Sequence, residues 1–227
     1  MPLIIAIDGP SGVGKSTVGR KVAEHLGIPY LDTGAMYRAV GLLARRKGVA
    51  LPIADAEAVR HLAEKADIRF AVTAGGARTL LNGEDVSAEI RTPEVSLYAS
   101  AVSAIPAVRR RLVGIQRELA LSGGGLLEGR DIGSKVVPET PFKFFLTATP
   151  EVRAMRRFRE LQARGNTQSY EQVAAEMEAR DKADASRKDS PLVCERGHIP
   201  VDTSDIGVEE VVAIILARVR QGASASG

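Results

Sequence analysis

Near its beginning the chain reads LIIAIDGPSGVGKST over residues 3–17. The apolar run at 3–7 is typical of a strand buried on both faces of a parallel sheet, because such strands lack a polar alternation. Residues 15–27 predict a helix, since apolar side chains recur at every fourth position and a glycine follows them. A glycine-rich segment joins the two elements. This order of strand, loop and helix predicts an α/β fold.

The joining segment fits the pattern G-x-x-x-x-G-K-[ST]. Glycines let the backbone bend so that N–H groups surround phosphate oxygens, and the helix that follows adds its positive dipole end. We expect Lys15 to reach the β- and γ-phosphates of a nucleoside triphosphate and the Ser16 hydroxyl to ligate Mg²⁺. The predicted ATP-binding residues are Gly9, Pro10, Ser11, Gly12, Val13, Gly14, Lys15, Ser16 and Thr17.

The rest of the chain continues the alternation of strands and helices. Further strands are predicted at 29–31, 125–128, 142–146 and 199–201, with helices between them and a last helix over about 208–220. This predicts a central parallel sheet covered by helices. Two short strands around Ala74-Gly75-Gly76 predict a hairpin that interrupts the alternation, so we interpret it as an insertion. The small, polar tail at 222–227 is expected to be disordered.

Composition excludes several classes of protein. The net charge of the 227-residue chain is +3 (31 Lys and Arg against 28 Asp and Glu), and aromatic residues make up only 4% with no Trp, which argues against nucleic-acid binding. A single cysteine, Cys194, allows no internal disulfide, and no apolar stretch is long enough to span a membrane. His25, His61 and His198 lack metal-ligand spacing. We expect a cytoplasmic protein, and a monomer since nothing marks an interface.

A phosphate-binding loop by itself does not distinguish kinases from GTPases and motors. The D-x-x-G and N-K-x-D strings of GTPases are absent, and the strand at 125–128 does not end in the two adjacent acids usual in motors. These absences favour a small-molecule kinase. A nucleotide-dependent switch or motor stays open as the alternative from another class.

Arginines gather in two later segments. Arg153 and Arg157 are four residues apart on the helix predicted after Pro150, where like charges cost stability unless an anion binds them; a solvated face is the plainer interpretation. Arg180, Asp184 and Arg187 would form one stripe if their helix continues that far. An ordinary ion pair is again the plainer interpretation of that stripe.

Taken together, these segments resemble the bacterial cytidylate (CMP/dCMP) kinases of the nucleoside monophosphate kinase group. The matching strings are IDGPSG at 7–12, LDTGAMYR at 31–38, LNGEDVS at 81–87 leading into IRT at 90–92, EGRDIG at 128–133, and Arg180-Asp181 with Asp184 and Arg187 before SPL at 190–192. VDTS at 201–204 extends the match. The insert segment and the glycine-arginine-aspartate segment are more specific than the phosphate loop.

The resemblance implies a role for each matching residue. Ser100, Arg109 and Asp131 would contact cytosine, with Thr33 near the monophosphate site; Arg38, Arg130 and Arg187 would bind the CMP phosphate, and Arg180 and Asp184 the sugar hydroxyls. Lys15, Arg153 and Arg157 would be catalytic, the two arginines closing over the triphosphate with a lid. The substrates would be ATP, CMP and dCMP.

The resemblance also implies a domain plan. One kinase domain over 1–221 would have a core of about 1–35, 105–150 and 190–221, a monophosphate-binding part of about 36–104 and a lid of about 151–189. The reaction would be in-line transfer from ATP·Mg²⁺ to CMP or dCMP in pyrimidine metabolism. The alternative is a P-loop kinase for another small acceptor, such as UMP, AMP or shikimate.

Overall fold

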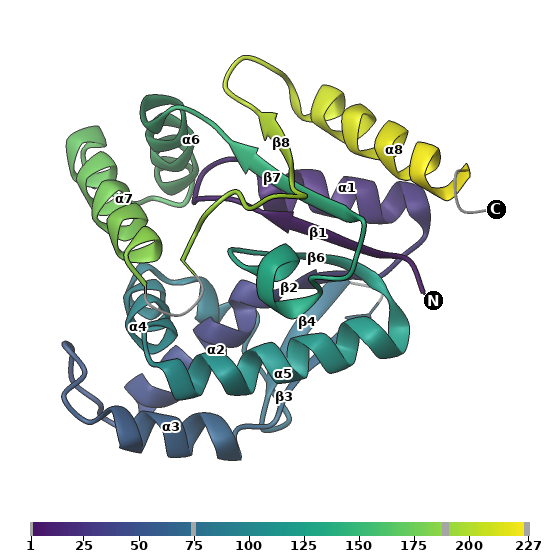
Figure 1. Ribbon diagram of the computed structural model, residues 1–227. Coiled ribbons are helices and arrows are strands. Elements are labelled where there is room, and N and C mark those ends of the chain that lie inside the picture. Colours follow the sequence, from purple (N-terminus) through teal and green to yellow (C-terminus); the bar gives the residue numbers. More distant parts are fainter. Residues whose placement is uncertain (1, 74–75, 188–190, 225–227) are drawn as a thin grey trace. The chain divides into compact units, whose positions relative to one another are not determined.

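The computed structural model describes residues 2–73, 76–187 and 191–224. Contacts between residues divide the chain into two units (Figure 1). Unit 1 comprises Met1–Tyr30 and Ala120–Gly227, and unit 2 comprises Leu31–Leu119. The core segment that the sequence suggests from residue 105 onward therefore begins inside unit 2.

A parallel sheet of five strands has the order β2-β6-β1-β7-β8. Its strands belong to unit 1, except that β2 has only its first residue, Tyr30, there. The strands are β1 (Ile4–Asp8), β2 (Tyr30–Asp32), β6 (Gly125–Gly129), β7 (Phe142–Thr147) and β8 (Ile199–Asp202). β1 lies in the centre, parallel to β6 and β7. The predicted fold class is confirmed, and because the strands are parallel their carboxyl ends share one edge of the sheet.

The helices α1 (Lys15–Leu26) and α8 (Val208–Ser224) lie side by side on this sheet (Figure 1). Their apolar side chains join those of β1 and β7 in one core, which includes Ile7, Phe144 and Ile215. α8 extends through residues 222–224, which we predicted to be disordered. A Cβ on Gly222 would lie 2.5 Å from the ring of Phe142, so the end of the helix packs closely against β7. Residues 225–227 lie outside the described part of the chain.

Two further helices of unit 1, α6 (Pro150–Ala163) and α7 (Tyr170–Ala185), pack against each other. The Thr149 and Ser169 side chains cap them, each accepting a hydrogen bond from a backbone N–H of the first turn. A small core between them contains Ala154, Leu161, Val173 and Met177. This pair therefore has apolar packing of its own, separate from that of the sheet.

Unit 2 combines helices with a small antiparallel sheet. The helices are α2 (Thr33–Arg46), α3 (Ala56–Lys65), α4 (Pro93–Ser103) and most of α5 (Pro106–Gly123), the sheet is β3 (Ile68–Thr73), β4 (Gly76–Leu81) and β5 (Glu84–Asp85), and a short 3₁₀ turn, η1, spans Glu89–Arg91. The predicted pairing of the hairpin strands is confirmed; its turn residues Ala74 and Gly75 lie outside the described residues. α2 and α4 approach closely at Gly41, where a Cβ would lie 2.8 Å from the backbone nitrogen of Ala99.

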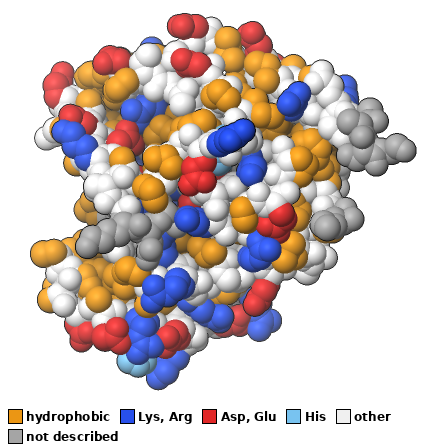
Figure 2. Space-filling model, in the orientation of Figure 1, with side chains coloured by type: hydrophobic (Ala, Val, Ile, Leu, Met, Phe, Trp, Pro, Cys, Tyr) orange, Lys and Arg blue, Asp and Glu red, His pale blue; other side chains and the backbone are white. Residues whose placement is uncertain are grey.

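Charged side chains of both signs are interspersed on the face drawn in Figure 2. Among the described residues, none of the helices has the length and apolar character that a membrane span requires.

Candidate functional site

The phosphate-binding loop connects β1 to α1 at the carboxyl edge of the parallel sheet. Gly9, Gly12 and Gly14 all have positive φ angles, of 145°, 82° and 90°. A Cβ on Gly9 would lie 2.2 Å from the carbonyl oxygen of Leu146, so no other residue fits this position. The first turn of α1 has no acidic residue and no side-chain cap. Its N–H groups and positive dipole end therefore suit an anion.

Lys15 lies within this loop with only 8% of its surface exposed, and its Nζ donates to the carbonyl oxygen of Pro10 at 2.6 Å. The pKa of Lys15 is lowered to about 7, first by burial and then by the positive charges of Arg130 and Arg180, against the carboxylates of Glu128 and Asp8, which raise it. A buried ammonium group among arginines is stabilised when an anion arrives. The electrostatics around Lys15 therefore favour a phosphate-bearing ligand.

Ser16 follows Lys15, and its Oγ donates to Oε1 of Glu128 at 2.7 Å. Glu128 is 5% exposed and lies in β6 opposite Ile7 of β1. Hydroxyl and carboxylate oxygens are the hard donors that suit Mg²⁺. The sequence did not lead us to Glu128 as a site residue, although an acid near the end of a buried strand was a usable signal. The described residues hold no group of three or more His, Cys, Asp or Glu placed for a metal ion.

Arg130, Asp184 and Arg187 come together as an ion cluster. Nε of Arg130 donates to Oδ2 of Asp184 at 2.9 Å, and Nη2 of Arg187 donates to Oδ1 of the same carboxylate. Burial would raise the pKa of Asp184, but the charges of Arg130, Arg187 and Arg180 outweigh it and lower the pKa. The single stripe expected if the helix reached Arg187 does not form, because α7 ends at Ala185 and Arg187 lies beyond it.

Asp131 follows Arg130 and is 3% exposed. It directly precedes a π-helical turn, η2 (Ile132–Val136). Its side chain does not cap that turn. Arg130 and Asp131 are therefore the first two residues after β6. They lie at the same edge of the sheet as the phosphate loop.

The two arginines of α6 differ in their surroundings. Arg153 is 7% exposed: its Nη1 donates to the carbonyl oxygen of Ser11 in the phosphate loop at 3.4 Å and to Oδ2 of Asp181 on α7. Nη1 of Arg157 instead donates to Oε2 of Glu160 at 2.9 Å, in an exposed pair along the helix. The structure therefore brings Arg153 to the phosphate loop, whereas Arg157 has an exposed partner on its own helix.

Unit 2 carries the four remaining predicted residues. Nη2 of Arg38 donates to Oδ2 of Asp32 at 2.6 Å. Asp32 also caps α2 by accepting from the N–H of Ala35, and Thr33 is the buried first residue of the helix. The sequence analysis did not single out Asp32, which both caps α2 and accepts from Arg38, because both roles depend on its position directly before α2.

Arg109 and Ser100 lie on α5 and α4 of unit 2. Arg109 is 4% exposed, and its Nη1 donates to the carbonyl oxygen of Ser103 at 3.2 Å. Its guanidinium carbon lies 5.4 Å from the centre of the Tyr37 ring, a cation–π distance. Ser100 is half-buried, and its carbonyl oxygen accepts from the Ser103 hydroxyl at 2.8 Å.

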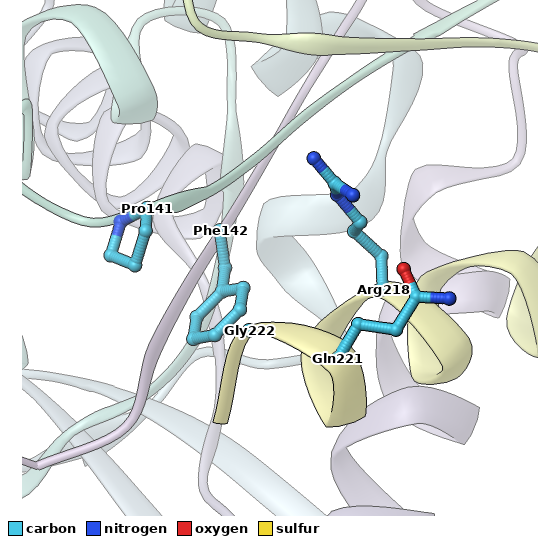
Figure 3. A pocket seen from close by; sticks show the side chains of 5 residues that line it. All are labelled: Pro141, Phe142, Arg218, Gln221 and Gly222. Atoms are coloured by element: carbon cyan, nitrogen blue, oxygen red, sulfur yellow. The ribbon is translucent and has the colours of Figure 1, made fainter. Parts of the chain in front are cut away.

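A separate cavity of about 260 Å³ lies at the opposite edge of the sheet of unit 1 (Figure 3). Its lining consists of Pro141, Phe142, Arg218, Gln221 and Gly222. Phe142 begins β7, so this cavity lies at the amino edge of the parallel strands. None of the predicted site residues lines it.

The phosphate loop and the arginines near it define the class of protein. A phosphate loop between the central strand of a parallel sheet and its helix defines a P-loop nucleotide-binding protein. The arginines held near that loop are typical of phosphotransferases, in which they neutralise charge on the transferred group.

The comparisons with known proteins identify the family. The family model for cytidylate kinase matches residues 5–221, and the chain belongs to this family. It is 49% identical over 219 residues to a cytidylate kinase of Pelotomaculum thermopropionicum, covering 96% of each chain. It is 48% identical over 214 residues to one of Syntrophotalea carbinolica, covering 94% of this chain and 90% of the relative. The resemblance seen in the sequence is confirmed.

A solved structure, described as an uncharacterized protein from Eubacterium ventriosum, shares the fold. It aligns with 97% of this chain and 99% of its own, with a TM-score of 0.52 and 14% sequence identity. This likeness is one of fold alone.

Proposed function

We propose that the protein transfers the γ-phosphoryl group of ATP to CMP and dCMP, giving ADP and CDP or dCDP. Family membership over residues 5–221 carries this proposal. The buried Lys15 at the phosphate loop, with the charges of Arg130 and Arg180 near it, supports it from the side of chemistry. The reaction belongs to pyrimidine nucleotide metabolism.

The phosphate loop, residues 9–17, holds the triphosphate of ATP. In this proposal Lys15 binds the β- and γ-phosphates. Burial lowers the pKa of Lys15, and the negative charge of the γ-phosphate raises it again, so that Nζ is protonated. Arg153 and Arg157 are lid residues that stabilise negative charge on the transferred phosphoryl group. Arg153 donates to the carbonyl oxygen of Ser11, so it is next to the phosphate loop. The acceptor oxygen of CMP is anionic at neutral pH, so the transfer needs positioning and charge neutralisation more than a base.

The oxygen donors near the loop fit Mg²⁺, since the Ser16 hydroxyl and the Glu128 carboxylate are within hydrogen-bond distance of each other. In our proposal Ser16 holds the ion, with Glu128 beside it. When bound, Mg²⁺ would neutralise negative charge on the triphosphate.

The proposed acceptor residues are assigned within each unit by itself. In unit 1, Arg130 and Arg187 bind the CMP phosphate, Asp131 the cytosine, and Arg180 and Asp184 the sugar. The Arg130–Asp184–Arg187 cluster supports these roles because one carboxylate orients both guanidinium groups. In unit 2, Arg38 binds the phosphate and Thr33 lies near it, while Ser100 and Arg109 recognise cytosine. The hydrogen bond from Arg38 to Asp32 supports the phosphate-binding role of Arg38, because it fixes the orientation of the planar guanidinium group.

The proposal includes a lid of about residues 151–189, a monophosphate-binding part of about 36–104, and a monomeric enzyme in the cytoplasm. The separate core between α6 and α7 supports the lid, because a pair with its own packing is able to move as one body. Lid closure keeps water from competing with CMP for the phosphoryl group. Sedimentation at micromolar concentration tests the monomer.

An acceptor panel tests the function. ADP release from ATP·Mg²⁺ is measured with CMP, dCMP, UMP, AMP and shikimate, beside wells with no acceptor and with single-stranded DNA. We expect CMP and dCMP to exceed every other acceptor by at least about 100-fold in kcat/KM, about 2.7 kcal/mol of discrimination. Comparable activity on UMP, AMP or shikimate contradicts the cytosine assignment of Ser100, Arg109 and Asp131. Turnover that needs DNA, or no acceptor, contradicts the kinase.

A further inference from the structure

Asp8 ends β1, directly before Gly9 of the phosphate loop, and only 1% of its surface is exposed. Its carboxylate is shared between two backbone groups that lie more than 120 residues later in the chain. Oδ1 accepts from the N–H of Ile132 at 2.8 Å, and Oδ2 accepts from the N–H of Gly133 at 2.8 Å. Both N–H groups belong to the first residues of the π-helical turn η2.

This pair of hydrogen bonds is a helix cap supplied from another strand. The first N–H groups of a helical turn have no partner within the turn, and buried N–H groups need one. Asp131 stands at the capping position of η2, but its side chain makes no capping hydrogen bond. Asp8 fills that role instead, and an ionised carboxylate is well suited to it because it accepts two bonds at once.

The surroundings of Asp8 restrict where this turn can lie. Nε2 of His198, the residue directly before β8, lies 3.4 Å from Oδ2 of Asp8. A Cβ on Gly133 would lie 2.7 Å from the same Nε2 and 2.9 Å from Cδ of Lys143. The start of η2 is therefore confined between the Asp8 carboxylate and two neighbouring side chains.

The segment held in this way carries two residues of the proposed acceptor site. Arg130 and Asp131 immediately precede Ile132, and Arg130 is bound on its other side by Asp184. We propose that Asp8 is a positioning residue for the acceptor nucleotide: by capping η2 from the phosphate-loop strand, it fixes Arg130 and Asp131 relative to the loop that holds ATP. The inference rests on the proposed function for the roles of those two residues.

The substitution Asp8→Asn tests it with little change of shape. Asparagine has one acceptor oxygen and places an NH₂ group against the second N–H, so one of the two bonds is lost. We expect the KM for CMP to rise about tenfold and the preference for CMP over UMP to fall about fivefold, with the KM for ATP changed by less than about threefold. Asp8→Ala removes both bonds and is expected to give larger changes in the same direction.

A control separates positioning from loss of stability. Ile215 is fully buried on α8, in the core of unit 1, and has no part in the site. Ile215→Ala creates a cavity and lowers the midpoint of urea unfolding, but it should leave the KM for CMP and the CMP-to-UMP preference unchanged. If Asp8→Asn and Ile215→Ala raise the KM for CMP equally at matched stability, the positioning role is overturned.

A second readout does not depend on the substrate. Amide hydrogen exchange of residues 131–134 should be at least about tenfold faster in Asp8→Asn than in the wild type, while exchange in β7 stays the same. Unchanged exchange, or an unchanged KM for CMP and CMP-to-UMP preference, overturns the inference. If the wild type does not phosphorylate CMP at all, the proposed function fails, and the exchange measurement alone then decides whether Asp8 holds the turn.

Discussion

Binding of ATP at pH 8 should be accompanied by uptake of a proton from solution, because Lys15 becomes protonated. In the protein without nucleotide, burial first and the charges of Arg130 and Arg180 next hold the pKa of Lys15 near 7, far below its ordinary value of 10.5. With a pKa of about 7, about one Lys15 in ten is protonated at pH 8. The bound triphosphate places several negative charges beside Nζ and raises its pKa again. Binding should therefore take up about 0.9 proton at pH 8 and about 0.1 proton at pH 6.

Isothermal titration calorimetry of ATP·Mg²⁺ into the protein measures this directly. The titration is repeated at pH 8 in buffers with different ionisation enthalpies, and the slope of the observed enthalpy against the buffer enthalpy gives the protons taken up. The chelated triphosphate is fully ionised at pH 8, so it adds nothing to the slope. Lys15→Arg is the matched control, because a guanidinium stays charged throughout and should abolish the uptake. A slope near zero in the wild type, or an equal slope in Lys15→Arg, refutes the reasoning.

Three further predictions concern single residues. Gly9→Ala should lower the free energy of unfolding, measured with urea, by about 2 kcal/mol or more and kcat/KM for ATP by at least about 100-fold. The reason is that the new Cβ would lie 2.2 Å from the Leu146 carbonyl oxygen, at a φ of 145°. A variant with wild-type kinetics would contradict this prediction. Tyr37→Leu should raise the KM for CMP about fivefold, the equivalent of about 1 kcal/mol of lost contact with the Arg109 guanidinium, while Tyr37→Phe keeps the ring and should stay near the wild type. For His198, the hydrogen bond to Asp8 raises the pKa. The stability this adds is fully present below the unfolded pKa of about 6.5 and is lost as pH rises through the folded value, so His198→Gln should cost about 1 kcal/mol at pH 5.5 and clearly less at pH 9; a pH-independent difference in urea unfolding would contradict it.

Much of the fold was predictable because its signals are local. The buried strand at β1 and the hairpin of β3 and β4 each depend on residues within a few positions of one another. We did not predict α3, although the Asp55 side chain caps it and its buried Val59 and Ala63 lie four residues apart, which were usable local signals.

The extent of two helices depended on contacts that the sequence does not display. α8 continues to Ser224 because Gly222 packs against Phe142, some 80 residues earlier in the chain. α7 ends at Ala185, and the backbone N–H of Leu192 then binds the carbonyl oxygen of Asp184. Arg187 accordingly reaches Asp184 from beyond the helix, although the spacing suggested a helical stripe.

The candidate site divides in the same way. The phosphate loop was readable because its pattern is contained in one continuous segment, residues 9–16. Glu128 and Asp8 were not singled out, because their roles depend on the register that places Glu128 opposite Ile7 and on the turn that follows β6. The resemblance to a family supplied Arg130, Asp184 and Arg187, and the structure adds that the two arginines share one carboxylate.

The central claim is that CMP is the acceptor of the phosphoryl group, and phosphorus NMR of the reaction mixture tests it most directly. The purified protein is incubated with ATP, Mg²⁺ and CMP, and the products are followed with time, with Lys15→Met as the inactive control. We predict that the phosphorus signal of CMP and the γ-phosphorus signal of ATP disappear one-for-one, while the β-phosphorus signal of nucleoside diphosphates grows by two for each transfer. ADP accompanied by inorganic phosphate, with CMP left unchanged, would contradict the account.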